Sequence, residues 1–390
     1  MRIFLSCLQS DTRHPVPAYG FWETYFKKGL EEGGHEWVEA EEVDWAEGLT
    51  YDRGDEGLAR WKDRTWSRAL EAIRTAHEEK EIDLFLSYLF PKQVEPSAVR
   101  DIQNLGIPCV NFFCDNVREL RSVPESYHCF DLHWVPEFKA LAMYEEAGLK
   151  HIHAPMPCWV PPEQRQCDHE ENYGPTFIGS RDALREALFA DVLKQGVSLN
   201  LAGTGWDQEE TGGTQETRGV SQLGRLPRMI QNQLHLVDEH GLSGLVNKMS
   251  YRFRPEVDDA IFQESAYGWI SGDEYVRMTQ ESEVTIGVNR YPSFRRPFQN
   301  PDTYSRLRDI EAPMMGACYL TEWTEGIDER YEIGHEIETY RTAEELVNRI
   351  GEIKQYPKKR KRMRCSAQKK ALRNHSVGAT IDAIISQMSA

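Results

Sequence analysis

Glu311, Arg306 and Arg308 lie in a stretch whose apolar residues recur at helical spacing. Gly316 ends this pattern, and the short apolar run at 317–321 predicts a buried strand. The two oxygens of a carboxylate can accept hydrogen bonds from the neighbouring hydroxyls of a ribose, and the planar guanidinium group of arginine binds phosphate. These residue types therefore indicate a nucleotide site. A solvated amphipathic helix with incidental charges is the alternative.

A basic and aromatic loop comes just before this stretch. The apolar run at 283–289 predicts a strand that ends at Asn289 and Arg290, and Arg295 and Arg296 follow within a few residues. In open α/β sheets, ligands bind at the carboxyl ends of the strands. Because the chain is acidic overall, this loop is where we expect negative charge to bind.

Two earlier turns also have features of a phosphate site. A predicted strand at 176–179 ends at Gly179 and is followed by Arg181 at the start of a helix, and a second strand at 197–202 is followed by Gly203. The amides at the amino terminus of a helix attract phosphate, and so does an arginine beside them. A single glycine turn of this kind is not specific by itself.

Asp115 follows a further predicted strand, at 108–114. A carboxylate at the carboxyl end of a strand is well placed to act as a general base. The alternative is a structural role, in which Asp115 or Asn116 accepts hydrogen bonds from the first amides of a following helix. His14 and His153 are further candidates, and a solvated loop or the core is the ordinary alternative for such histidines.

Length and composition indicate a globular protein with two domains. The chain has 390 residues, of which 40% are hydrophobic and 11% aromatic, so two separate cores can form. It contains no run of about 18 apolar residues, and its amino terminus lacks the pattern of a signal peptide. We therefore expect a cytoplasmic protein without a membrane span.

The charge and the cysteines argue against several other classes of protein. The net charge of −17 opposes non-specific binding to nucleic acid or to anionic lipid. The basic run at 358–364 falls in a predicted helix, where we interpret it as a solvated face. The eight cysteines form no CxxC pair and no Cys/His ligand pattern, which predicts reduced thiols and no metal site.

Alternating strand and helix patterns predict an α/β fold in both halves of the chain. A polar stretch at 156–173 with several prolines predicts a linker between a first domain at 1–155 and a second domain at 174–375. The pattern is least clear near 211–263, which we interpret as an insertion that covers a cleft or forms a subunit contact. Three helices are predicted at the carboxyl end, at 342–353, 357–372 and 377–388.

The stretch at 307–346 resembles the carboxyl-terminal segment of the glycosyltransferase family 1 and 4 group, and most closely its CgeB-like (spore-protein) branch. The shared features are a Glu-Ala run that ends in glycine, here beginning at Glu311, and a Gly-x-x-Glu, here beginning at Gly326. The resemblance implies that Glu311 binds the ribose of a donor and that Gly326 shapes the donor loop. Many relatives carry a second glutamate eight residues earlier, where this chain has Thr303.

The resemblance also implies the GT-B architecture, an α/β fold of two facing Rossmann-like domains. In that architecture the second domain binds the donor, the first binds the acceptor, and the C-terminal helix, here 376–390, crosses back to the first domain. His14, Tyr19, Gly20 and His153 would then face the cleft between the domains. GT-B enzymes stabilise the leaving group with arginines and helix dipoles, and no DxD triplet occurs here, so neither a metal nor another cofactor is expected.

The predicted activity is transfer of a sugar from a nucleotide-diphosphate sugar to a hydroxyl acceptor of unspecified identity. Asp115 would be the base if the reaction inverts configuration, whereas a retaining reaction needs no such base, and the sequence does not choose between them. The alternatives are a non-catalytic protein that binds nucleotide-sugars or polysaccharides and a glycosyltransferase that acts on modified nucleic-acid bases. The net charge argues against a nucleic-acid substrate. The sequence does not decide whether the chain forms a homo-oligomer.

Overall fold

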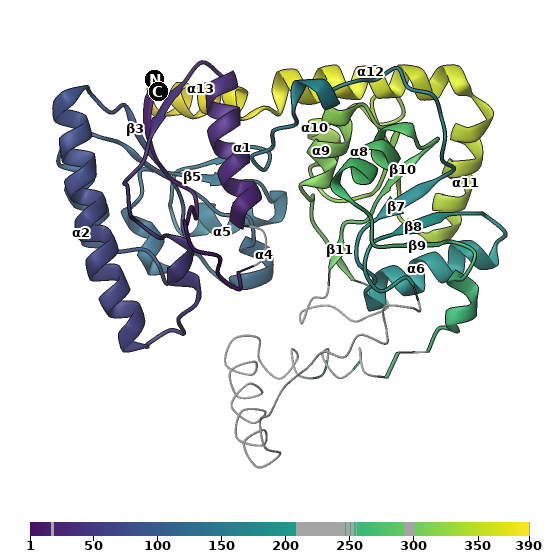
Figure 1. Cartoon of the computed structure of the whole chain (residues 1–390), viewed down its shortest axis with the longest axis horizontal. Coiled ribbons are helices and arrows are strands. Elements are labelled where there is room, and N and C mark those ends of the chain that lie inside the picture. The colour runs from purple at the N-terminus through teal and green to yellow at the C-terminus, as the bar shows by residue number, and fades with distance from the viewer. Residues whose placement is uncertain are drawn as a thin grey trace, which may run out of the picture. The chain divides into compact units, whose positions relative to one another are not determined.

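The computed structural model describes residues 1–16, 19–207, 246, 250, 253–254, 256–291 and 301–389 of the chain (Figure 1). The chain divides into two compact units. The first unit comprises Met1–Pro161 and Ala371–Ala390, and the second unit comprises Pro162–Lys370. Each unit is built around a six-stranded sheet.

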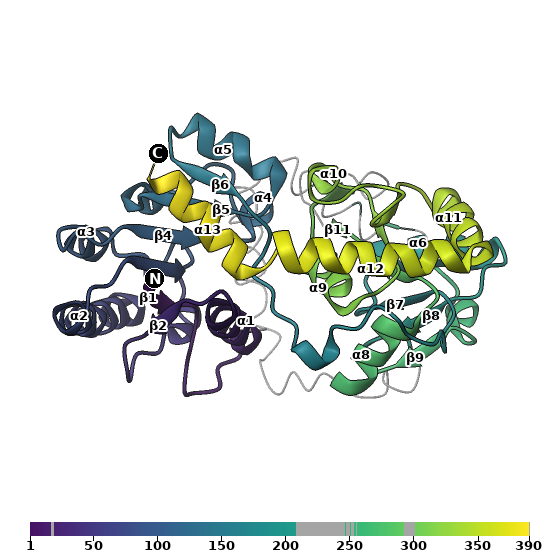
Figure 2. The same ribbon diagram turned by 90° about the horizontal axis from the view of Figure 1, so that it is seen from above.

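The sheet of the first unit has the strand order β2-β1-β3-β4-β5-β6, and every pair of neighbours is parallel. Helices α2 and α3 lie on one face of the sheet and α1 lies on the other, as Figure 2 shows, so the central strands are buried. The strands are β1 (Arg2–Ser6), β2 (Glu36–Val38), β3 (Leu84–Tyr88), β4 (Cys109–Phe112), β5 (Leu132–Val135) and β6 (His151–His153). The α-helices are α1 (Tyr19–Glu32), α2 (Glu56–Glu79), α3 (Pro96–Gln103), α4 (Asn116–Glu119), α5 (Leu141–Glu146) and α13 (Val377–Met388). Short 3₁₀ helices span η1 (Ala46–Leu49), η2 (Glu125–Cys129) and η3 (Phe138–Ala140).

Aromatic side chains fill the space between α1 and the sheet of the first unit. The rings of Trp22 and Phe26 on α1 contact the ring of Phe112 on β4, with centroids 5.6 and 5.8 Å apart. Phe26 also contacts Trp134 on β5, at 5.9 Å between centroids. These contacts fix the end of β4 from which Asp115 continues.

Helix α13 packs closely against α1. A Cβ atom added to Gly33 would lie 2.8 Å from the Cα atom of Gly378, and one added to Gly29 would lie 2.5 Å from the side chain of Val377. Glycines therefore permit the close approach of the two helices. Because α13 is part of the first unit, the predicted return of the C-terminal helix to the first domain is confirmed.

The sheet of the second unit has the strand order β14-β13-β10-β7-β8-β9, again with parallel neighbours. Helix α6 packs against α11, and α8 packs against α9. The strands are β7 (Thr176–Ile178), β8 (Asn200–Ala202), β9 (Ala266–Gly268), β10 (Thr285–Gly287), β13 (Tyr319–Glu322) and β14 (Glu338–Tyr340), and an antiparallel pair is formed by β11 (Arg290–Tyr291) and β12 (Asp302–Thr303). The helices are η4 (Pro162–Gln164), α6 (Ala183–Lys194), η6 (Asp259–Phe262), α8 (Gly272–Glu281), α9 (Arg308–Met315), α10 (Ile327–Arg330) and α11 (Ala343–Gln355). Helix α12 (Pro357–Asn374) belongs to this unit up to Lys370, and its last turn belongs to the first unit.

The elements predicted around Glu311 are confirmed. Helix α9 ends at Gly316, whose φ of 86° is the left-handed conformation that glycine adopts readily. Strand β13 follows, as the apolar run at 317–321 predicted. The three predicted carboxyl-terminal helices correspond to α11, α12 and α13. Most of the predicted insertion at 211–263 lies outside the described residues.

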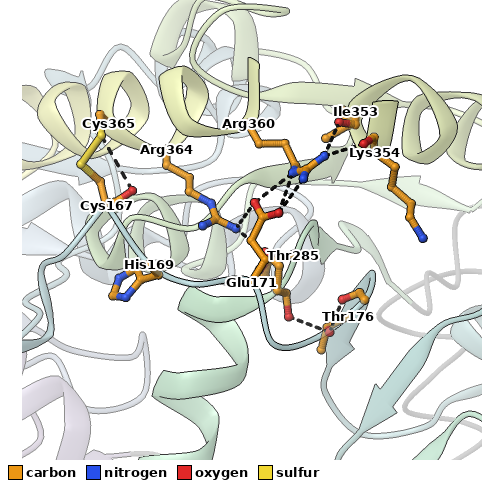
Figure 3. Close-up of polar contacts among 12 residues, drawn as sticks. Cys167, His169, Glu171, Thr176, Thr285, Ile353, Lys354, Arg360, Arg364 and Cys365 are labelled. Atoms are coloured by element: carbon orange, nitrogen blue, oxygen red, sulfur yellow. Dashed lines mark hydrogen bonds and ion pairs between the residues drawn. A yellow bond between two sulfur atoms is a disulfide. The ribbon is translucent and has the colours of Figure 1, made fainter. Parts of the chain in front are cut away.

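Cys167 and Cys365 form a disulfide, which corrects the prediction that all cysteines are reduced thiols. The two residues are 198 positions apart, so no local spacing in the sequence indicates their pairing. The bond connects the segment before β7 to α12 (Figure 3). The six other cysteines form no disulfide: Cys7, Cys109, Cys114, Cys129, Cys158 and Cys318.

The basic run on α12 is partly buried, which corrects its interpretation as a solvated face. Arg360 and Arg364 are only 5% and 2% exposed. Glu171 accepts hydrogen bonds from Nε and Nη2 of Arg360 at 2.9 and 2.5 Å, and its Oε1 lies 3.2 Å from Nη2 of Arg364 (Figure 3). Arg360 and Arg364 can be buried here because both contact the carboxylate of Glu171, which lies in the segment before β7.

Candidate functional site

A buried carboxylate, Asp309, fixes the helix that carries Glu311. Asp309 is 0% exposed and lies in the first turn of α9. It accepts hydrogen bonds from Asn289 Nδ2 (3.1 Å), Ser305 Oγ (2.8 Å), the Arg306 amide (3.2 Å), Tyr319 OH (2.8 Å) and Thr321 Oγ1 (2.8 Å). These donors come from the end of β10, the start of α9 and β13. Asp309 therefore holds α9 against the carboxyl end of the sheet.

A second buried carboxylate, Glu322, holds Arg290. Its Oε1 accepts from Nε and Nη2 of Arg290 at 2.8 and 2.5 Å, and its Oε2 accepts from the amides of Asn289 and Arg290 at 3.1 and 2.9 Å. Burial acts to lower the pKa of Arg290, but Glu322 more than offsets this, so the pKa lies above its usual value. The charge of Arg290, a predicted phosphate ligand, is thus matched within the chain.

Glu311 is less buried than these two carboxylates. Its Oε2 accepts a hydrogen bond from the hydroxyl of Tyr275 on α8 and lies 3.6 Å from Nε of Arg308. The guanidinium group of Arg308 lies over the ring of Tyr275, 4.7 Å from its centroid. Glu311 is therefore a carboxylate whose orientation is set by a neighbouring tyrosine and arginine.

The guanidinium group of Arg185 is within electrostatic range of those of Arg306 and Arg308, which lie at the start of α9. Burial is the main cause that lowers the pKa of Arg185; Asp182 opposes the shift, and the positive charges of Arg306 and Arg308 add to it. Nη1 of Arg185 donates to the carbonyl of Ser180 at 2.7 Å, and its Nε forms an ion pair with Oδ2 of Asp182 at 3.3 Å. Such a group of cations is suited to bind a polyanion.

Arg181, the arginine predicted to bind phosphate, is engaged by carboxylates. Its guanidinium group pairs with Glu186 at 3.3 Å and with Asp259 at 2.5 Å, and it lies 4.8 Å from the ring centroid of Phe262. Asp182 caps α6 by accepting from the amides of residues 184 and 185. The Asp182 side chain therefore already accepts the hydrogen bonds that these first-turn amides could otherwise donate to a phosphate.

The predicted glycines of the second unit lie at turns of the backbone. Gly179 follows β7 and Gly203 follows β8, and a Cβ atom added to Gly203 would lie 2.6 Å from the carbonyl oxygen of Gly179. Gly326 begins α10 with a φ of 81°. Arg295 and Arg296 lie outside the described residues. The structure thus brings together Asn289, Arg290 and Arg306 around Asp309 and Glu322, whereas Glu311 on the same helix contacts Tyr275 and Arg308. The sequence analysis missed Arg185, because only the fold brings it within electrostatic range of Arg306 and Arg308.

The candidates of the first unit lie on three separate segments: a loop, helix α1 and strand β6. Nε2 of His14 lies 2.6 Å from Oδ2 of Asp44. Tyr19 begins α1, and Gly20, the next residue, is exposed. His153 ends β6, with its ring centroid 5.6 Å from that of Phe138. The functional role of each of these residues stays a prediction.

Asp115 lies between β4 and α4, but its side chain does not cap the helix. The amide of Val117 instead donates to Oε2 of Glu137 at 3.2 Å. Asn116 donates to the carbonyl of Phe113 at 2.7 Å. The alternative in which Asp115 is a simple helix cap is therefore wrong, because Glu137 takes that place.

The part of the chain that the structure describes contains neither a membrane-spanning helix nor a cluster of metal ligands. None of its helices is long and apolar enough to cross a membrane. In the same part of the chain, no group of three or more His, Cys, Asp or Glu side chains is arranged to hold a metal ion.

Comparison with known proteins identifies a family and a fold. The model of the glycosyl transferase-like family matches residues 181–386, a range that includes α9 with Asp309 and Glu311. No curated protein sequence matches the chain significantly.

Solved structures resemble the chain over its whole length. Sucrose-phosphate synthase from Thermosynechococcus elongatus is 12% identical with a TM-score of 0.54, covering 99% of this chain and 98% of that one. Anabaena Alr3699/HepE, solved in complex with UDP, is 12% identical with a TM-score of 0.52, at the same coverage. A glycosyltransferase from Rickettsia africae is 10% identical with a TM-score of 0.53, covering 99% and 97%. These similarities confirm the predicted GT-B fold.

Proposed function

Because this chain belongs to the glycosyl transferase-like family, we propose that it transfers a sugar from a nucleoside-diphosphate sugar to a hydroxyl acceptor. The second unit binds the donor and the first unit binds the acceptor. The observation that carries this proposal is the group of Arg185, Arg306 and Arg308 beside Glu311. The stretch at 307–346 supports a place near the CgeB-like branch.

The arginines and Glu311 bind different parts of the donor. The three arginines bind the diphosphate and stabilise the charge that develops on it when the bond to the sugar breaks. Glu311 accepts hydrogen bonds from the ribose. Asp309 and Glu322 hold the surrounding backbone before the donor binds, so less ordering is needed on binding. If the reaction inverts configuration, Asp115 takes the proton of the acceptor hydroxyl.

Replacing Glu311 by alanine should weaken the binding of UDP by about 10- to 150-fold, which corresponds to about 1.5–3 kcal/mol for hydrogen bonds to a charged group. Isothermal titration calorimetry with UDP and other nucleoside diphosphates measures this change. Glu325→Ala, at an exposed position in the same unit, is the matched control. Failure of the wild-type chain to bind any nucleoside diphosphate would contradict the proposed function. Binding without hydrolysis or transfer of a donor would favour the non-catalytic alternative.

Replacing Arg185 by alanine should weaken the binding of UDP by a similar factor but leave the weaker binding of uridine unchanged, because only UDP carries the diphosphate. Arg181→Ala is the matched control, since the guanidinium group of Arg181 pairs with two carboxylates, Glu186 and Asp259, whereas that of Arg185 pairs only with Asp182 among the described residues. Calorimetry at two salt concentrations measures both variants. An equal or greater loss in Arg181→Ala would show that the diphosphate lies at the turn after β7 instead. We retain Arg295 and Arg296 as candidates for the same role.

A further inference from the structure

Glu137 is a fully buried carboxyl group close to Asp115. It is 0% exposed and follows β5, the strand next to β4, from which Asp115 continues. Its Oε2 accepts the hydrogen bond from Val117, while its Oε1 is buried and has no hydrogen-bond partner. Burial makes an ionised carboxylate costly in such a place, whereas a neutral acid avoids that cost.

The surroundings of Glu137 also disfavour its ionisation. Burial is the largest cause that raises its pKa to about 8, the negative charge of Asp115 adds to the shift, and the amides of Val117 and Asn116 partly oppose it. Cys114 and Tyr144, whose own pKa values burial raises, also interact electrostatically with Glu137. Asp115, Cys114 and Tyr144 are each neutral or negative, so none of these three groups stabilises an ionised Glu137.

Glu137 also fixes the backbone that carries Asp115. Helix α4 begins at Asn116, immediately after Asp115, and Glu137 rather than Asp115 accepts from the amide in its first turn. The side chain of Asn116 is held in turn by the carbonyl of Phe113 and the hydroxyl of Tyr144, at 2.7 and 2.8 Å. The position of the Asp115 backbone therefore depends on Glu137 and on the residues around it.

We propose that Glu137 and Asp115 act as a pair that holds one proton and one negative charge at neutral pH, with the proton on Glu137, and that Glu137 positions Asp115 as the general base. The role of the pair in catalysis rests on the proposed function. Its protonation does not, and can be measured in a chain that transfers no sugar.

The pair changes charge once in an inverting transfer. The O–H bond of the acceptor breaks and its proton moves to Asp115, while the acceptor oxygen forms a bond to the anomeric carbon as the bond from that carbon to the diphosphate breaks. Glu137 keeps its own proton throughout, so the pair passes from one negative charge to none. When Glu137 ionises, the pair starts with two like charges in a buried place, and their repulsion displaces Asp115 from the position that α4 gives it.

The protonation of the pair can be read from the C=O stretch of protonated carboxyl groups in infrared difference spectra of the full chain. The wild-type spectrum should contain a band that disappears with a midpoint near pH 8 and is absent in Glu137→Gln. Asp115→Asn removes the neighbouring negative charge, so the midpoint should fall by about one pH unit. Glu145→Gln, at an exposed position on α5, is the control and should leave the band unchanged. A Glu137 that titrates near pH 4–5, as ordinary glutamates do, or a midpoint that Asp115→Asn does not move, overturns the proposal.

Stability gives a second measurement that needs no activity. The folded pKa of Glu137 is above the unfolded value, so its contribution to the free energy of unfolding is complete below the unfolded pKa and is lost as pH rises through about 8. Glu137→Gln cannot ionise, so the melting temperature of this variant should fall less between pH 6 and 9 than that of the wild type. An unchanged pH dependence would contradict a protonated Glu137.

Turnover then tests the positioning role. With saturating donor, kcat of the wild type should decline as pH rises through about 8, and this decline should be absent in Glu137→Gln, while the KM for the donor stays the same in both. A decline that persists in Glu137→Gln would show that Glu137 has only a structural role. If the infrared and stability results hold but no chain transfers sugar, the proposed function fails and the proton pair stands.

Discussion

Replacing Asp309 by alanine should lower the free energy of unfolding of the second unit by about 3–5 kcal/mol, the cost of breaking a buried charge interaction. Asp309 accepts from five donors, and its removal leaves buried donors such as Tyr319 OH and Asn289 Nδ2 without their acceptor. Urea unfolding followed by tryptophan fluorescence and circular dichroism measures the loss. Asp328→Ala, at an exposed position on α10, is the control and should stay within about 0.5 kcal/mol of the wild type.

Asp309→Asn separates the charge of Asp309 from its shape. Burial is the main cause that lowers the pKa of the buried Arg330, and the negative charge of Asp309 opposes that shift. Without this charge, the pKa of Arg330 should fall further, and the variant should lose stability although its side chain is nearly isosteric. A loss below about 1 kcal/mol in both variants would show that the donors find other partners.

Replacing Glu322 by glutamine should cost about 3–5 kcal/mol, because Arg290 then remains buried without a counter-charge. The side chain of Glu322 is 4% exposed and that of Arg290 is 13% exposed, so water cannot replace the lost interaction fully. Chemical unfolding measures the change, and Glu325→Gln is the exposed control three residues away.

A double-variant cycle tests whether the loss arises from the pair. Arg290→Met alone and Glu322→Gln alone each leave one polar partner buried, whereas the combined variant removes both charges. The combined loss should therefore be smaller than the sum of the single losses by at least about 1 kcal/mol. Additive losses would mean that Glu322 acts mainly through the amides of Asn289 and Arg290.

The helix and strand around Glu311 could be predicted because their signals are local. Apolar residues at helical spacing, a glycine and a short apolar run follow one another within a few turns of chain. Asp309 could not be recognised in the same way, although it lies two residues before Glu311. Its role depends on donors at 289, 305, 306, 319 and 321, which only the folded sheet brings to one carboxylate.

The arginines show the same limit. Arg181 and Arg185 are four residues apart in the sequence. No local pattern therefore predicts which of the two binds a phosphate. The fold pairs Arg181 with Asp259 across a long sequence separation, whereas Arg185 pairs with the nearby Asp182 and lies within electrostatic range of Arg306 and Arg308. Arg290 likewise meets Glu322 only because β10 and β13 are neighbours.

The choice between base and cap for Asp115 illustrates a different difficulty. Either role fits a carboxylate between a strand and a short helix, and the sequence left both open. The outcome depends on Glu137, which reaches α4 from the neighbouring strand and occupies the capping position. A local sequence pattern cannot show that Glu137, and not Asp115, accepts the hydrogen bond from the amide of Val117.

The disulfide between Cys167 and Cys365 closes a covalent loop that spans 198 positions, about half of the chain. In detergent without reductant, this loop keeps the denatured chain more compact, so it should migrate faster in a gel than the reduced chain does. A protease that cuts once anywhere between these two cysteines should therefore release no fragment. The two pieces separate only after a reductant is added.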